Sequence, residues 1–394
     1  MNFMKLGEIC DFKGGSQPPK QEWIKESNDG YVRMLQIRDF TKSRSFDIEY
    51  VKKSSKLRYC TKEDILIGRY GASVGKILTG LEGAYNVAIM KSIPNEDIIR
   101  KEYVRRYFES PLFQIPLINI CNQRAAQAGF SKEDIEDLEV PVPSLSEQDR
   151  IVKILDAAFE KIDRLKENAE KGLQEVKNLW EARLSNLFEA KDGWTNSNLG
   201  SLVDFKNGVN FTPSENGTKI KFLGVGDFKD RVTITASDLD YISTNQTIDN
   251  EYHLQKDDII IVRSNGSKTL VGRTVIFNEN IDEPLIYSGF CIRCRIKDKS
   301  LLLPAFLNIL FRTTKVKRHL TYGDNGCNIS NINQKKLSSL QISYPSLEDQ
   351  KKIVEEYEFL SSLCKRLTFN YEKELAEYEA LKQSILRKAF SGEL

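Results

Sequence analysis

The sequence predicts an α+β protein of two similar halves, each a mixed globular domain followed by one long helix. Two observations carry this prediction. The chain contains the same series of motifs twice, and the spacing of its apolar residues changes to a helical pattern at the end of each copy. Because the repeat unit is far longer than that of a solenoid, each copy is expected to be a domain with its own core. The two long helices are expected to form an antiparallel coiled coil, which gives the chain a pseudo-twofold internal repeat.

Three motifs recur in the same order in both halves. The first reads Leu-Gly-x-x-x-Asp-Phe-Lys-x-Gly, the second Asp-Ile-(Leu/Ile)-Ile-x-Arg and the third Pro-Ser-Leu-x-x-Gln. They occupy residues 6–15, 64–69 and 143–148 in the first half and residues 199–208, 258–263 and 345–350 in the second. The second motif predicts a short strand, and glycine-rich turns on either side of it indicate a compact mixed domain.

The motifs divide the chain into four segments. We expect an N-terminal globular domain over residues 1–143, a long helix over 144–190, a C-terminal globular domain over 191–345 and a second long helix over 346–394. Each long helix begins at a capping-box sequence, in which a serine is followed three residues later by Glu147 or Asp349. A helix of roughly 43 residues would be about 65 Å long.

Apolar residues in both long helices recur at alternating steps of four and three, which is the seam of a coiled coil. The predicted seam residues are Ile151, Leu155, Ala158, Ile162 and Leu165 in the first helix and Ile353, Tyr357, Leu360, Cys364 and Leu367 in the second. A solvated helix packed on its own domain is the alternative. The further apolar residues Phe159, Leu179, Trp180 and Phe188 exceed one narrow seam and predict an interface with other subunits.

Composition narrows the class of protein. The net charge is only +2 over 394 residues, so any nucleic-acid surface must be local. Seven scattered cysteines predict reduced thiols and not a disulfide framework. No apolar run is long enough to cross a membrane and no signal peptide is evident, so we expect a cytoplasmic protein with no membrane partner.

The sequence argues against a phosphate-binding P-loop, a zinc site and a catalytic site. The segment from Gly71 to Lys76 lacks the first glycine and the final hydroxyl of a phosphate-binding P-loop. Cys291 and Cys294 form an isolated pair, and their thiols would point to opposite faces of a strand. They are therefore not expected to bind a zinc ion together. With only two histidines, no catalytic group, metal site or cofactor site is predicted.

The order of the motifs resembles the specificity subunit of type I restriction-modification systems. The resemblance spans the full length and includes the ending Ala-Phe-Ser-Gly-Glu-Leu over residues 389–394. It implies that each globular half is a target-recognition domain that reads one part of a bipartite DNA site, and that the helices fix their spacing. It also implies a non-catalytic subunit whose partners are double-stranded DNA, two methyltransferase subunits and two restriction subunits.

The resemblance places candidate DNA contacts on the loops after the second motif and on the segments ahead of each long helix, and other polar or basic residues of each half complete the candidate set. Glycines let the backbone approach phosphates, while Arg, Lys, Gln and Asn reach base edges or phosphate oxygens. In the first half they are Lys13, Gly15, Gln36, Arg38, Arg69, Gly71, Ser73, Lys76, Arg124 and Gln127. In the second half they are Lys206, Asn210, Arg263, Ser264, Asn265, Lys268, Arg273, Lys317, Arg318 and Asn325. An exposed hairpin with solvated charges is the alternative for each loop, and a solvated helix face is the alternative for Lys317 and Arg318.

Two other functions remain open from the sequence. One is a self-contained DNA methyltransferase or nuclease, against which the absence of any such motif counts. The other is an adaptor whose two domains bind protein.

Overall fold

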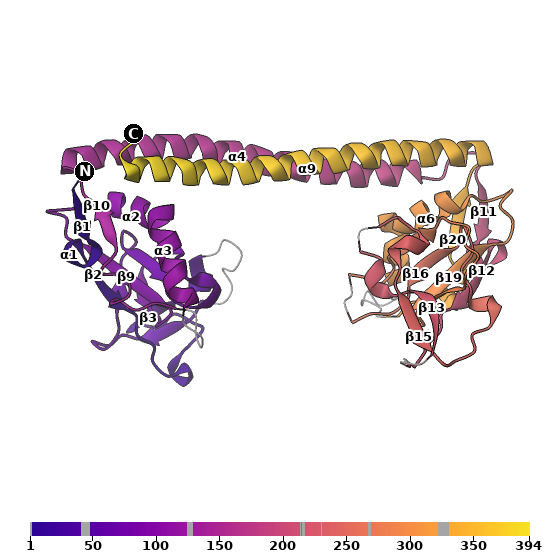
Figure 1. The fold of residues 1–394 in the computed structure, drawn as a ribbon, viewed down its shortest axis with the longest axis horizontal. Coiled ribbons are helices and arrows are strands. Elements are labelled where there is room, and N and C mark those ends of the chain that lie inside the picture. Colours follow the sequence, from indigo (N-terminus) through magenta and orange to yellow (C-terminus); the bar gives the residue numbers. More distant parts are fainter. Residues whose placement is uncertain are drawn as a thin grey trace. The chain divides into compact units, whose positions relative to one another are not determined.

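The computed structural model describes residues 2–40, 48–123, 129–212, 214, 217–229, 231–266, 269–321 and 331–394. The chain forms two compact units (Figure 1). Unit 1 comprises Met1–Glu170 and Glu372–Leu394, and unit 2 comprises Lys171–Tyr371. Helix α4 (Leu145–Leu187) and helix α9 (Leu347–Ser391) are therefore each divided, with one part in unit 1 and the other in unit 2.

Unit 1 contains two four-stranded sheets and a short pair of strands. The first sheet has the order β2 (Cys10–Gly14), β9 (Ile89–Pro94), β6 (Ile65–Gly68), β7 (Ile77–Leu78), with antiparallel neighbours throughout. The second has the order β4 (Tyr50–Lys52), β3 (Tyr31–Leu35), β8 (Gly83–Tyr85), β5 (Tyr59–Cys60). Strands β1 (Phe3–Lys5) and β10 (Glu139–Pro141) pair separately, and the helices are α1 (Leu6–Ile9), α2 (Lys101–Glu109) and α3 (Pro111–Asn122).

Unit 2 repeats this plan. Its larger sheet has the order β12 (Val203–Asn207), β19 (Cys291–Ile296), β16 (Ile259–Val262), β17 (Thr274–Phe277), β14 (Thr233–Ile234). Its smaller sheet has the order β15 (Tyr241–Thr244), β13 (Thr218–Leu223), β18 (Leu285–Tyr287). Strands β11 (Thr195–Asn198) and β20 (Gln341–Tyr344) pair separately, and the helices are α5 (Leu199–Leu202), α6 (Pro304–Arg312), α7 (Thr314–Thr321) and α8 (Gln334–Ser338).

The central strands explain why the second motif is apolar without interruption. Both β6 and β16 are buried along their whole length, because each lies between a helical layer and the smaller sheet. In β16, Ile259 and Ile261 face the core built by α6, while Ile260 and Val262 face the core built by β13 and β18. Alternate residues of one strand point to opposite faces, so both faces need apolar side chains.

The same alternation confirms the prediction for the cysteine pair. Cys291 lies in the core on one face of β19 and Cys294 in the core on the other. Both thiols are free and buried. Burial raises the pKa of each thiol far above its ordinary value.

Within each unit, α4 and α9 run antiparallel and lie side by side (Figure 1). In unit 1, Lys166 pairs with Glu379 at 3.0 Å. Lys382 pairs with Asp163 at 3.4 Å. Residue numbers therefore fall along α4 where they rise along α9, as in an antiparallel pair. In unit 2 the same order appears where Gly172 lies against Tyr371 and Arg183 pairs with Glu356. The expected antiparallel pairing is thus present in both units.

Burial follows the predicted seam with two exceptions. Ile151, Leu155 and Ile162 are buried, Ala158 is partly buried, and none of the five predicted residues of α9 is exposed. Leu165 does not belong to the seam, because its side chain is 45% exposed. The buried positions continue from Ile162 to Ala169 and Val176, so the seam passes on the other side of Leu165.

The second exception is Phe159, which was expected to be surplus to the seam. It is only 2% exposed, and two cations cover its ring. The guanidinium of Arg106 lies 4.8 Å from the ring centroid and the ammonium of Lys382 lies 4.6 Å from it. Of the other surplus residues, Trp180 and Phe188 are partly buried and Leu179 is 69% exposed.

A buried glutamine fixes each globular domain to the start of its long helix. Gln148 donates from Nε2 to the carbonyls of Ile98 and Pro143 at 3.0 and 2.9 Å and accepts from the Arg100 N–H at 2.7 Å. Gln350 makes the same three bonds, to Leu301, Pro345 and Leu303. Each glutamine is fully buried, so this residue of the third motif has a structural role.

Serine caps complete the same corner. Ser144 accepts from the Glu147 N–H at 3.4 Å and Ser346 accepts from the Asp349 N–H at 3.3 Å, as the capping sequences predict. The beginning of each long helix is therefore held by its cap and by the buried glutamine.

Candidate nucleic-acid interface

The strand-end arginines occupy equivalent places in the two units. Arg69 follows β6 and its N–H donates to the Ala88 carbonyl at 2.9 Å, while Arg263 follows β16 and donates to the Phe290 carbonyl at 2.9 Å. A second segment joins each loop through one isolated bridge, Tyr70 to Gly129 in unit 1 and Ser264 to Asn331 in unit 2. The repeat in sequence is therefore also a repeat in loop geometry.

Each guanidinium is anchored by one edge only. Arg69 Nε donates to the Phe130 carbonyl at 3.2 Å, and Arg263 Nε donates to Asn331 Oδ1 at 3.3 Å. No other hydrogen bond or ion pair to the described residues engages either guanidinium. The two terminal nitrogens of each fork remain available, which is the arrangement that bidentate contact with a guanine edge requires.

Packing requires glycine at Gly15 and Gly208 of the first motif, because neighbouring backbone leaves no room for a Cβ. A Cβ at Gly15 would lie 2.0 Å from the Asn86 carbonyl oxygen, and a Cβ at Gly208 would lie 2.2 Å from that of Ser288. A Cβ at Gly14 would lie 2.9 Å from Arg69 Nη1. The segment that carries Lys13 and Gly15 is thus brought next to Arg69, and Lys13 itself is exposed on β2.

The loop after β6 is a tight turn. Gly71 has a φ of +58°, which glycine adopts without strain. Ser73 Oγ donates to the Tyr70 carbonyl at 2.6 Å, so its hydroxyl serves the turn. Lys76 is exposed.

Two candidates of unit 1 are engaged by a carboxylate. Gln36 Nε2 and Arg38 Nη2 both donate to Glu49 Oε2, at 2.8 and 2.5 Å, and Lys20 Nζ pairs with Oε1 at 2.6 Å. Burial pushes the pKa of Glu49 upward, but hydrogen bonds from Lys20 and Gln36 outweigh it and leave that pKa below its ordinary value. Gln36 and Arg38 therefore hold a local network together in this structure.

The candidates of unit 2 differ in how they are engaged. Lys206 pairs with Glu251 at 2.5 Å and lies 4.5 Å from the ring centroid of Tyr252. Arg273 donates to the Thr269 and Lys229 carbonyls. The side chains of Asn210, Lys317 and Arg318 are exposed, and those of Ser264 and Asn265 are partly exposed.

Four candidates lie outside the described residues: Arg124, Gln127, Lys268 and Asn325. One residue that sequence reasoning missed is Phe290, which is 57% exposed and lies beside the backbone of Arg263. Its counterpart at the same hydrogen bond in unit 1 is Ala88. An aromatic residue directly after Gly289 was the only signal in the sequence.

The described residues hold no group of three or more His, Cys, Asp or Glu side chains positioned for a metal ion. Over the same part of the chain, no helix combines the length and the apolar character needed to cross a membrane.

Comparison with known proteins relates both halves of the chain to one family. A model of the family described as type I restriction modification DNA specificity domain matches residues 1–175 and 191–378. The StySPI specificity subunit of Salmonella potsdam is 26% identical, with 95% of this chain and 85% of that protein covered. The EcoKI specificity subunit of Escherichia coli K12 is 23% identical with the same coverage.

Two solved structures show the same fold. A chain from a study of complex assembly and conformational transition of the type I R-M system superimposes with a TM-score of 0.77 at 18% identity, covering 100% of this chain and 98% of that one. The HsdS subunit from Thermoanaerobacter tengcongensis gives a TM-score of 0.54 at 20% identity, covering 100% and 97%. The chain therefore belongs to the family of type I restriction-modification specificity subunits, which are non-catalytic, and carries two copies of its DNA specificity domain.

Proposed function

We propose that each unit reads one half of a bipartite sequence in double-stranded DNA. The observation that carries this proposal is the strand-end arginine, which has the same backbone bonds and the same one-sided anchoring in both units. An arginine held by Nε presents its two terminal nitrogens in a fixed orientation, and a bidentate pair with guanine discriminates against a wrong base by about 1–3 kcal/mol. Two such readers favour a split target with uncontacted bases between its halves.

The proposal extends to the assembly. Large apolar side chains remain exposed on the long helices: Leu179, Phe359 and Phe369 in unit 2 are 69%, 69% and 64% exposed. Unit 1 exposes Leu165 and Leu381, at 45% and 46%. Exposed apolar residues at this density favour a protein partner. We assign these surfaces to two methyltransferase subunits, with two restriction subunits completing a complex that acts in the cytoplasm, where DNA is present and cysteines remain reduced.

Selection of bound duplexes from a random pool tests the proposal. The chain is co-expressed with its methyltransferase subunit, and the recovered sequences are aligned. The proposal predicts two short conserved blocks separated by a spacer of constant length and variable sequence. A continuous recognition site would contradict it. An enriched protein partner that survives nuclease treatment, with no DNA retained, would favour the adaptor function instead.

A further inference from the structure

Unit 2 contains a cavity of about 210 Å³ beside the end of the loop that begins at Arg263. Nine residues line this cavity and five of them carry a positive charge: Lys229, Arg231, Arg273, Arg312 and Lys317. They come from three separate parts of the chain, which is why no single basic run in the sequence indicates the cavity. No acidic side chain lines it among the residues that the structure describes.

Three of the five cations are without a carboxylate partner in the described part of the chain. Arg231 pairs with Asp238 at 3.0 Å, but Lys229, Arg312 and Lys317 form no ion pair there. Asp230, adjacent in sequence to two lining residues, lies outside the described residues. The cavity therefore gathers positive charge that the surrounding described side chains do not neutralise.

Backbone carbonyls hold Arg312 in place at the cavity. Its Nη2 donates to the carbonyls of Arg231 and Thr274, while its Nε is buried without a hydrogen-bond partner. Burial lowers the pKa of Arg312, and the charge of Arg273 lowers it further, although Tyr357 acts in the opposite direction. Arg312 is partly buried, and burial of a cation is costly unless hydrogen bonds and an anion compensate it.

The rim of the cavity carries a strained backbone. Lys229 has a φ of +32°, a conformation that residues with a Cβ adopt rarely. Its carbonyl accepts a hydrogen bond from Arg273. Such strained conformations gather at ligand sites.

We propose that this cavity binds a phosphate group. Arginine forks and lysine ammonium groups match the several acceptor oxygens of a tetrahedral anion, and the volume accommodates one such group with water. The source is either a phosphate of the DNA backbone, in which case the inference rests on the proposed function, or a free phosphate or phosphorylated small molecule.

Unit 1 lacks the cavity's chemistry at the matching positions. Glu109 stands at the end of α2 where Arg312 ends α6, and it pairs with Arg105 and Arg106 at 3.1 and 2.8 Å. Gln114 stands in α3 where Lys317 stands in α7, and its Nε2 donates to the carbonyls of Gly75 and Phe108. The inferred site is therefore a property of unit 2 alone.

The first arm of the test measures thermal unfolding of the full chain in sodium phosphate and in sodium chloride of equal ionic strength. Four proteins are compared: the unaltered chain, Arg312→Gln, Lys317→Gln and the control Lys315→Gln, which removes one charge from the same helix outside the cavity lining. Phosphate should raise the midpoint of the unaltered chain and of the control. Both cavity variants should bind phosphate roughly tenfold more weakly, as expected for a lost charged hydrogen bond. Lys317 is exposed, so its variant should fold even where Arg312→Gln does not.

The second arm identifies the source. Affinity for duplex DNA is measured against salt concentration, and loss of one phosphate contact should reduce the slope of log K against log salt by ~0.9. A reduced slope in Lys317→Gln but not in Lys315→Gln, with base preference unchanged, assigns the cavity to a DNA phosphate. An unchanged slope with a lost phosphate response assigns it to a free phosphate. Absence of any phosphate effect beyond chloride in the first arm overturns the inference, and that arm decides even if the chain binds no DNA.

Discussion

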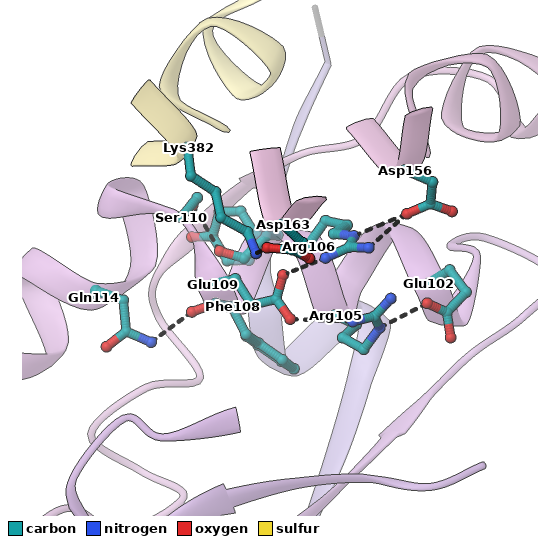
Figure 2. A network of polar contacts seen from close by, with 11 residues as sticks. Glu102, Arg105, Arg106, Phe108, Glu109, Ser110, Gln114, Asp156, Asp163 and Lys382 are labelled. Carbon is teal, nitrogen blue, oxygen red and sulfur yellow. Dashed lines mark hydrogen bonds and ion pairs between the residues drawn. The ribbon is translucent and has the colours of Figure 1, made fainter. Parts of the chain in front are cut away.

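The helix that faces the long helices carries opposite chemistry at one matching position in the two units, although both helices also pack through apolar residues. In unit 1, α2 meets α4 through charge: Arg106 bonds Asp156 at 2.6 Å and Glu109 at 2.8 Å, and Arg105 joins Glu109 and Glu102 (Figure 2). In unit 2, Ile309 of α6 stands where Arg106 stands in α2, and packs in a cluster with Tyr357 and Leu184. One architecture thus accepts a polar or an apolar contact at the same place.

What stays constant between the units is the geometry of the corner. Ser110 and Thr313 each donate to the carbonyl three residues earlier, at 2.6 and 2.7 Å. Phe390 lies 5.0 Å from Tyr103, and Phe188 lies 5.0 Å from Phe306, measured between ring centroids. The difference teaches that the backbone bonds, caps and aromatic contacts specify this fold, while the surrounding charges are free to vary.

The aromatic contact should show the largest effect. Phe390→Ala should destabilise unit 1 by about 3–5 kcal/mol, because the ring is fully buried and its loss leaves a cavity. Phe188→Ala should cost unit 2 less, since that ring is only partly buried. Fluorescence-detected unfolding separates the units: Trp23 reports unit 1, and Trp180 and Trp194 report unit 2. Equal losses in the two variants would show that the two corners are packed alike.

The buried glutamines should show the next largest effect, and the same one in both units. Gln148→Leu and Gln350→Leu each leave two carbonyls and one N–H without a partner. Each substitution should lower the free energy of unfolding of its own unit by ~3 kcal/mol. A loss confined to one unit in denaturant titration would mean that the shared geometry is not a shared source of stability.

The charged contact should show a smaller effect that depends on salt. Arg106→Met should cost unit 1 about 1–2 kcal/mol at low ionic strength, and the loss should shrink in molar salt, where charges are screened within about 3 Å. Ile309→Met is the matched control in unit 2, with a cost below ~1.5 kcal/mol that salt leaves unchanged. Identical salt responses would remove the proposed contrast between the two helices.

The smallest effect concerns pH. Burial pushes the pKa of Asp64 upward, but hydrogen bonds from Lys91 and the Thr61 N–H outweigh it, so the folded-state pKa lies below 3.8. A depressed carboxylate pKa stabilises the fold above the unfolded-state pKa, and this contribution is lost as the pH falls through the folded-state value. Unfolding of unit 1, followed by Trp23 below pH ~4, should therefore be less dependent on pH in Asp64→Asn. An equally steep dependence in the variant would assign it to other groups.

The sequence predicted the large features because they repeat or have a period. Two copies of three motifs indicated two domains, and steps of four and three indicated the paired helices, although Leu165 fits those steps and is nevertheless exposed. Steps of four and three give a repeat of 3.5 residues, whereas a straight α-helix has about 3.6 residues per turn, so the repeat drifts around the surface of a long helix. A pattern alone therefore does not decide which of two neighbouring residues lies in the seam.

The candidate site was less accessible to sequence reasoning, because contacts between distant residues decide which side chains remain available. Arg38 was predicted to contact DNA, yet its guanidinium forms an ion pair with Glu49 at 2.5 Å. Gly15 looked like an approach point for phosphate, yet the Asn86 carbonyl already requires a glycine there. Arg312 ends an apolar helix, and only the fold brings it to Lys229 and Lys317.

Base preference of two single variants tests the central claim, that each unit reads its own half-site, most directly. Arg69→Ala and Arg263→Ala are each assembled with the methyltransferase subunit, and bound duplexes are selected from a random pool. Lys62→Ala serves as the control, because Lys62 is exposed and is not a predicted DNA contact. Arg69→Ala should relax one block of the site and Arg263→Ala the other, each by about 1–3 kcal/mol at one base pair. Relaxation of the same block by both variants, or a uniform loss of affinity with unchanged base preference, would contradict the account.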